Sequence, residues 1–482
     1  MRDVNQEWYL TWRRRHLYPA RRYLEIPLPH TSRPQQPGVP KKFNWASSAG
    51  AEVQPGFRAV RRGTYDDLCS ALAEVVGTST KGMDGAVIGN IHAGVHLVLS
   101  QLPVVWKVIV TTATTMSSIV PVDLLAAATN PLYFQNLVTT NASDPSTIAL
   151  LSYNDTFRND VLGENATARR LYNLDWQAFH EMGTYNRKTN SIYVTSNYQS
   201  LDNPINVTII DLGNDNAVSS TRYTNLAEAN GGTNWYPPGS TQDNSTTPPN
   251  LLFCDEGDFD RYSGLVSVDP STNESTVILD SFLGRNFSSV NDVRQHPETG
   301  DIWFTDAPYG FWQNFRPKTQ IPSQVYRFEP ATGNIQVVAD GFIASNGLEF
   351  SPDLKTLYVT DTGAQQSLVG GLNGTRPASI YAFDVVDGTR LANRRTFAWA
   401  ENGFPDGIHT DTQGNVWAGC GDGVHVWNVE GRLVGKVWNG VESNNFAFIP
   451  GGVLVFSNAQ LWIVEGIRAV GREICRDFGV CE

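Results

Sequence analysis

A repeat of short apolar runs constrains this chain more than any other feature of its sequence. From about residue 165 onward, six runs of strand-forming residues each follow a turn, and they start at Thr189, Pro249, Thr299, Leu354, Gln413 and Gly451, 38 to 60 residues apart. Further alternating, aromatic-rich runs follow each of them, bounded by Asp, Asn, Gly and Pro, so each unit predicts about four short antiparallel strands. This period is typical of one propeller blade. The sequence therefore predicts an all-β fold, a six-bladed β-propeller of four-stranded antiparallel blades.

The last unit ends one strand short, after QLWIVEGIR. A ring with a bare edge would expose unpaired backbone groups, so a strand from elsewhere must complete it. The run ATARRLYNLD, which begins at Ala166, is the candidate for this closing strand. We therefore expect a propeller over residues 166–468, a connecting segment over 129–165 and a C-terminal tail over 469–482.

The first part of the chain, residues 1–128, differs in composition from the rest. It carries basic clusters such as Arg13, Arg14 and Arg15, and a proline-rich stretch from Pro27 to Pro40. Its apolar stretch, residues 95–110, is short and interrupted by polar residues, so membrane association is not expected. We expect an irregular N-terminal extension that is partly disordered.

Charge and cysteine usage exclude two classes of function. The formal net charge of −12 argues against a nucleic-acid-binding protein, because phosphate binding needs clustered Lys and Arg. No cysteine pair has CxxC spacing, so a zinc site is not expected. Cys254 and Cys420 lie in apolar runs and are expected to be buried, whereas Cys475 and Cys481 could form a disulfide. That pair and several N-x-S/T acceptors favour a secreted glycoprotein over a cytoplasmic protein.

One acidic or amide residue precedes the second strand of several units at a nearly constant distance. Counting to the aromatic residue of that strand gives twelve for Glu181 to Tyr193, Asn291 to Trp303 and Asn346 to Tyr358, and eleven for Asp406 to Trp417. The innermost strands of a propeller line its channel, so residues at equivalent positions converge on the axis. Carboxylate and amide oxygens without thiolate or imidazole suit calcium. A divalent metal ion, Ca²⁺, is therefore the expected cofactor.

A simpler interpretation exists for each of these residues taken alone. Asn and Asp at strand starts commonly cap turns, and only the shared spacing argues against that role here. His180, beside Glu181, is more often a packed neighbour than a ligand at such a position, so we leave it out of the predicted site.

Three motifs make the sequence resemble a known family. NDV followed by GDIWFTDAPYG lies at residues 291–310, SNGLEFSPDLKTLYVTDT at 345–362 and PDGIHTDTQGNVW at 405–417. Together they resemble the gluconolactonase, senescence marker protein and luciferin-regenerating-enzyme family, over roughly residues 175–464. The resemblance implies a six-bladed propeller that hydrolyses lactones with a divalent metal on its axis.

The same resemblance implies roles for individual residues. Glu181, Asn346 and Asp406 correspond to the metal ligands of the family, and Asn291 lies close by, as a fourth predicted metal residue that also contacts the substrate. More loosely, Asn230 in ANGGT and Glu256 in FCDEGD resemble substrate-binding residues of its bacterial and fungal branches. Ser289 stands where the animal sugar lactonases have arginine, which leaves a preference for aldonolactones open.

The expected function is hydrolysis of a small-molecule lactone. A metal ion would polarise the carbonyl group, and Asp406 would act as the catalytic base that takes a proton from the attacking water. Two other functions remain open, because fold alone does not decide function. One is a paraoxonase-like hydrolase of aryl esters or phosphotriesters, and the other is a non-catalytic propeller that binds a partner and holds only structural calcium. The oligomeric state is not indicated.

Overall fold

A computed structural model describes residues 59–60, 88–91, 95–102, 105–112, 119–141, 148–240, 249–365 and 371–481. The chain divides after Ala113 into two compact units. Most of the expected extension, residues 1–128, lies outside the described residues, so the expectation of disorder stays a prediction. In the described part of the chain, no helix is long and apolar enough to span a membrane.

The described part of the first unit is a four-stranded antiparallel sheet. Its order is β1 (Ala59–Val60), β4 (Val105–Thr112), β3 (Val95–Leu102) and β2 (Ile88–Ile91). The apolar stretch 95–110, which the sequence leaves without a structural role, thus forms most of the β3–β4 pair.

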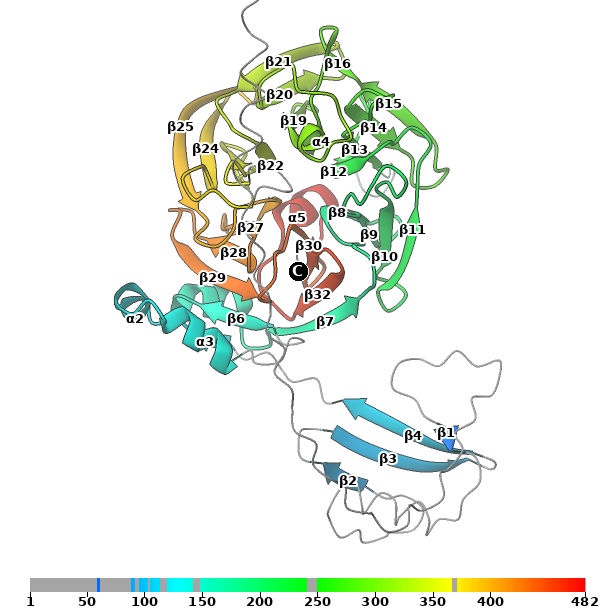
Figure 1. Ribbon diagram of the computed structural model, residues 1–482, viewed down its shortest axis with the longest axis vertical. Helices are drawn as coiled ribbons and strands as arrows, with labels where there is room; N and C mark the ends of the chain where they lie inside the picture. The colour runs from blue at the N-terminus through cyan, green and yellow to red at the C-terminus, as the bar shows by residue number, and fades with distance from the viewer. Residues whose placement is uncertain are drawn as a thin grey trace, which may run out of the picture. The chain divides into compact units, whose positions relative to one another are not determined.

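The second unit is a β-propeller whose six sheets surround a central axis (Figure 1). Blade 1 contains β8 (Glu181–Asn186), β9 (Ser191–Thr195), β10 (Val207–Asp211) and β11 (Ala217–Thr221), and blade 2 contains β12 (Ala229–Trp235), β13 (Asn250–Asp255), β14 (Gly264–Val268) and β15 (Ser275–Leu279). Blade 3 contains β18 (Val290–Gln295), β19 (Ile302–Asp306), β20 (Gln324–Glu329) and β21 (Asn334–Ala339), after a small ribbon of β16 (Ser281–Phe282) and β17 (Arg285–Asn286).

The remaining blades follow in chain order and confirm the predicted six-bladed fold. Blade 4 contains β22 (Ser345–Phe350), β23 (Thr356–Asp361), β24 (Ser379–Val386) and β25 (Arg390–Trp399). Blade 5 contains β26 (Ile408–Thr410), β27 (Val416–Cys420), β28 (Gly423–Trp427) and β29 (Leu433–Trp438), and blade 6 contains β30 (Asn445–Ile449), β31 (Gly452–Ser457) and β32 (Gln460–Glu465). The predicted closing strand, β7 (Thr167–Asn173), pairs antiparallel with β32 and completes blade 6.

Burial falls from the inner to the outer strand of a blade. Every residue of the inner strands β8, β18 and β22 is buried, whereas the outer strands β15 and β21 contain exposed and half-buried residues only. Aromatic side chains fill the blades and the space between them, and the indole rings of Trp303, Trp417 and Trp462 are fully buried. The alternating apolar runs of the sequence therefore bury their side chains between facing sheets.

Blade 5 is wider than the sequence predicts. On its outer edge β6 (Ala149–Ser152) pairs antiparallel with β29, and β5 (Ile119–Pro121) pairs in parallel with β6. The short helices α2 (Leu124–Thr129) and α3 (Tyr133–Asn141) join these two strands, and a π-helix, η2 (Phe157–Leu162), follows β6. These elements precede residue 166, the expected start of the propeller, yet they extend one of its sheets.

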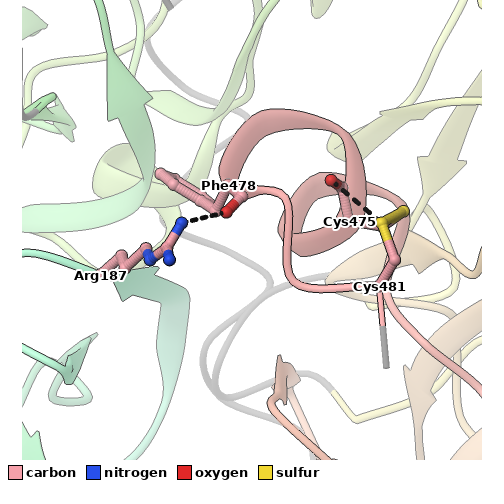
Figure 2. The surroundings of a disulfide bond; sticks show 4 residues. All are labelled: Arg187, Cys475, Phe478 and Cys481. Carbon is pink, nitrogen blue, oxygen red and sulfur yellow. Dashed lines mark hydrogen bonds between the residues drawn. A yellow bond between two sulfur atoms is a disulfide. The ribbon is translucent and has the colours of Figure 1, made fainter. Parts of the chain in front are cut away.

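The C-terminal tail ends in a helix, α5 (Arg472–Phe478), that lies close to the propeller axis (Figure 1). A disulfide joins Cys475 in this helix to Cys481 beyond it. Figure 2 shows Arg187, which follows β8 of blade 1, donating from Nη1 to the Phe478 carbonyl oxygen at 2.6 Å. The helix is therefore attached to the ring by its side chains as well as by the chain that precedes it. A second helix, α4 (Tyr309–Trp312), lies in the loop after β19.

Candidate active site

A polar cavity of about 90 Å³ lies where the inner strands begin. Its walls carry mostly amide and carboxyl groups: Asn197, Asn230, Asn291, Asn346, Asn444, Asn458, Gln313, Gln365, Glu181, Asp406 and Glu442, together with His180, Tyr309 and Phe404. No Lys or Arg of the described residues lines it. All four predicted metal ligands meet at this cavity, although they come from blades 1, 3, 4 and 5.

A repeated backbone irregularity places these side chains. The pairing of the inner strand with its neighbour shifts register between Met182 and Thr184 in blade 1 and between Ala229 and Gly232 in blade 2. It shifts again between Val290 and Val293 in blade 3 and between Ser345 and Leu348 in blade 4. Such β-bulges re-aim side chains and are frequent beside active sites. Each shift adjoins or contains one cavity residue: Glu181, Asn230, Asn291 and Asn346.

The amide groups around Asp406 all present their nitrogen atoms to it. Asn346 Nδ2 donates to Asp406 Oδ1, and Asn444 Nδ2 donates to Asp406 Oδ2 at 3.3 Å. The hydroxyl of Tyr309 accepts a further bond from Asn346 Nδ2 at 2.9 Å. The Oδ1 atoms of Asn346 and Asn444 are buried and have no hydrogen-bond partner, and the same is true of Asn291 Oδ1. Buried acceptors without a donor are costly, so three unpaired amide oxygens at one cavity suit a bound cation.

The two buried carboxylates are poorly compensated by protein charges. Glu181 accepts one bond, from Asn445 Nδ2 at 3.0 Å, and burial together with Asp406 holds its pKa well above the usual range. Burial and the carboxylate of Glu442 raise the pKa of Asp406 to about 7. A cation between these groups would stabilise both ionised carboxylates against burial and mutual repulsion. The donor set therefore fits a hard divalent ion.

Two other acidic clusters in the described residues already have cationic partners. In the first, Glu349, His409 and Glu473 approach one another, and Glu349 binds Arg472 at 2.7 Å and Arg294 at 3.1 Å. In the second, Glu401, Asp422 and His425 surround the buried ammonium of Lys436, which lies 3.1 Å from Asp422. These clusters are ion-pair networks, so the axial cavity is the better candidate for a metal.

The predicted substrate-binding residues occupy different positions. Asn230 lines the cavity, whereas Glu256 is 1% exposed and is not part of the wall. Glu256 Oε1 accepts a hydrogen bond from Asn230 Nδ2 at 2.5 Å, so it stands behind Asn230 as seen from the cavity. His180, left out of the predicted site, does line the cavity, and burial lowers its pKa to about 4.

Three buried aspartates outside the predicted site bind the backbone just ahead of cavity residues. Each is the last residue of the second strand of its blade. Each accepts hydrogen bonds from two consecutive backbone N–H groups, which lie three and two positions before an asparagine of the cavity. Asp255 accepts from Ala227 and Glu228 ahead of Asn230, Asp306 from Ser288 and Ser289 ahead of Asn291, and Asp361 from Ile343 and Ala344 ahead of Asn346. The signal was present in the sequence, since the runs FCD, FTD and VTD all end in Asp.

Comparisons with known proteins show which family the chain is similar to. The family model described as the SMP-30/gluconolactonase/LRE-like region matches residues 228–452. Lactonohydrolase oryL of Aspergillus oryzae is 30% identical over 330 residues, which cover 64% of this chain and 71% of that protein. A gluconolactonase of Zymomonas mobilis is 28% identical over 42% of this chain, and the match spans 56% of its own length. Among solved structures, a gluconolactonase of Xanthomonas campestris is 25% identical with a TM-score of 0.51, covering 67% of this chain and 94% of that one.

Proposed function

This chain belongs to the SMP-30/gluconolactonase/LRE-like family, and we propose that it is a lactonase that opens its substrate at the axial cavity. We propose further that Glu181, Asn346, Asp406 and Asn291 hold a divalent cation there, most suitably calcium. One observation carries the proposal: oxygen atoms from blades 1, 3, 4 and 5 meet at a cavity that no described Lys or Arg lines.

The ligand chemistry selects the class of metal. All four side chains offer carboxylate or amide oxygens, and calcium accepts six to eight such oxygens in irregular geometry. Zinc prefers nitrogen and sulfur ligands, which these four residues do not supply. The unpaired Oδ1 atoms of Asn291 and Asn346 are oriented for this role, because their Nδ2 atoms are already engaged by Asn230 and Asp406.

The protein groups then have separate tasks in hydrolysis. The bound cation would supply positive charge beside the carbonyl oxygen, where negative charge develops. Asp406 takes a proton from water as the water oxygen bonds to the carbonyl carbon. When the ring C–O bond breaks, the same proton passes to the departing ring oxygen, and a hydroxy acid results. Asn197 and Gln313 also line the cavity, and in this proposal their amides bind polar substituents of the lactone.

A hydrolysis screen tests this proposal. Aldono-, aliphatic and aromatic lactones, with paraoxon included, are offered to the metal-stripped protein and to the same protein after calcium is restored. We expect lactone turnover to disappear on stripping and to return with calcium. Faster turnover of paraoxon than of every lactone would favour the phosphotriesterase alternative, and full lactone turnover without metal would refute the metal site.

A further inference from the structure

The two ends of an asparagine side chain differ, and only one of them binds a cation. Asn291 can serve the proposed metal only if Oδ1 faces the cavity and Nδ2 faces away. The structure has this orientation, since Asn291 Nδ2 donates to Asn230 Oδ1 at 3.3 Å while Oδ1 is buried without a partner. The oxygen and nitrogen ends of the amide have nearly the same shape, so shape alone does not prevent a flip of Asn291. A hydrogen-bond partner must therefore favour the observed orientation.

The orientation of Asn291 depends on Asn230, which in turn contacts the buried Glu256. Its Oδ1 is taken by Asn291, and its Nδ2 donates to Glu256 Oε1 at 2.5 Å. A flip of Asn230 would turn its amide nitrogen towards the nitrogen of Asn291 and would leave Glu256 facing an oxygen. The two asparagines therefore flip together or not at all.

Glu256 is the natural origin of this preference. It directly follows β13, is 1% exposed and is held by its own backbone, whose N–H donates to the Glu228 carbonyl oxygen at 2.8 Å. Its Oε1 atom accepts the hydrogen bond from Asn230, so an acceptor oxygen of Glu256 selects the nitrogen end of that amide. Because Glu256 does not line the cavity and contacts Asn230, it acts through Asn230 and not on a ligand in the cavity.

We infer that Glu256 is a positioning residue that orients Asn230, and through it Asn291, so that Asn291 Oδ1 faces the bound cation. This inference rests on the proposed function, because it assumes a cation at the cavity. It changes the expected role of Glu256 from contact with substrate to control of a ligand. Residues that orient metal ligands typically change metal affinity ten- to a hundredfold when replaced.

The test compares two substitutions that both remove the carboxyl group. Glu256→Gln keeps an oxygen acceptor in a side chain of the same shape, whereas Glu256→Met keeps the bulk and loses the acceptor. Calcium affinity is measured by titration calorimetry on metal-stripped protein, with circular dichroism and thermal unfolding as checks on the fold. We expect Glu256→Gln to weaken calcium binding less than about threefold and Glu256→Met to weaken it about tenfold or more.

A third variant tests the hydrogen-bond relay from Glu256 through Asn230 to Asn291 without changing Glu256. Asn230→Ala removes the intermediate amide and should weaken calcium binding about as much as Glu256→Met. Adding Glu256→Met to Asn230→Ala should then have almost no further effect, because residues that act in series are not additive. Full additivity would overturn the relay.

The outcomes separate this inference from the proposed function. If the wild-type protein does not bind calcium, the proposed metal site fails, and this inference fails with it. If the wild type binds calcium and folded Glu256→Met or Asn230→Ala binds it equally well, the site stands and the relay is overturned. Equal weakening by Glu256→Gln and Glu256→Met would also overturn it, because loss of the carboxyl group and not loss of an acceptor oxygen would then control affinity.

Discussion

Asp406 accepts hydrogen bonds from the amide nitrogens of Asn346 and Asn444, and these bonds fix which atoms of the two amides face the cavity. A carboxylate at this position can therefore bind a cation, orient two neighbouring amides and accept a proton. These tasks can be separated, because Asn346 shares the first task but not the last.

We predict that high calcium restores activity to one of two variants and not to the other. Asp406→Asn should keep the fold and lower kcat by a factor on the order of a hundred or more, because the base is lost. Asn346→Ala should act mainly by weakening metal binding, so high calcium restores much of its activity and little of that of Asp406→Asn. Lactone hydrolysis measured against calcium concentration checks this. The surface variant Asp387→Asn is the control, and near-normal turnover of Asp406→Asn at saturating calcium would point to another base.

Asp361 does not line the cavity and instead binds the backbone just ahead of Asn346. Its carboxylate accepts three backbone N–H groups, from Ile343, Ala344 and Gly363, at 3.0 to 3.2 Å. Asparagine has only one oxygen, so Asp361→Asn leaves at least one buried donor facing an NH₂ group. We predict that this change lowers the free energy of unfolding by about 1 to 3 kcal/mol in urea titrations. Asp387→Asn, whose carboxylate is exposed, should change stability little, and equal effects would contradict the prediction.

At the scale of elements, α5 links parts of the ring that are distant in sequence. Arg472 binds Glu349 of blade 4, Glu473 lies 3.2 Å from Arg294 of blade 3, and the Phe478 carbonyl oxygen accepts from Arg187 beside blade 1. A seven-residue helix is too short to be stable alone, so these contacts and the disulfide hold it. The helix therefore acts as an internal clamp on the blades.

Replacing both Cys475 and Cys481 by serine should loosen this clamp first. The short loop that the bond closes contributes about 2 kcal/mol at most, and a unit of this size then loses only a few degrees in Tm. We predict faster hydrogen exchange at the amides of Cys475 and Gly479, with little change in the blade strands. Reducing the wild-type protein should have the same effect and should not affect the variant further. Unchanged exchange in both cases would show that α5 does not need the bond.

At the scale of the whole molecule, a buried ion-pair network lies on the axis on the α5 side. Glu349 of β22 is at its centre, and it faces Arg294 from β18, His409 from β26, and Arg472 and Glu473 from α5. Because the network joins three blades and the terminal helix, its ionisation affects the stability of the entire ring.

Stability should fall in acid as this network protonates. Burial raises the pKa of Glu349, but Arg472 and Arg294 outweigh burial and lower the pKa to about 2, below its usual value of 4.5. The ionised carboxylate therefore stabilises the folded state above about pH 4.5, and this contribution is lost as the pH falls towards 2. We predict that Glu349→Gln lowers stability at pH 7 by about 3 to 5 kcal/mol and makes the loss between pH 5 and 3 shallower.

Urea unfolding at several pH values measures this effect. The control is Glu430→Gln, which removes an exposed partner of Arg432 and should leave the pH dependence unchanged. A variant at position 349 with the wild-type pH profile would remove Glu349 as the origin of the acid sensitivity.

Features that repeat along the chain could be predicted from the residues alone. The turns and apolar runs predicted six blades, the missing strand predicted the pairing of β7 with β32, and a twelve-residue spacing identified Glu181, Asn291 and Asn346. These are local patterns, because alternation and turn residues depend only on neighbours within a few positions. In a ring of equivalent blades, residues at the same spacing from the second strand occupy the same place in their blades. The residues that meet at the axis could therefore be predicted.

Contacts between blades determine which atoms face the cavity and what holds them. Asn444, Tyr309 and the helix α5 do not share the spacing of the predicted ligands, and Glu256 supports Asn230 from behind the wall. The strands β5 and β6 join blade 5 from a part of the chain outside the repeat. The physical reason is that hydrogen-bond direction and charge compensation depend on partners from other blades, and these partners become neighbours only when the ring closes.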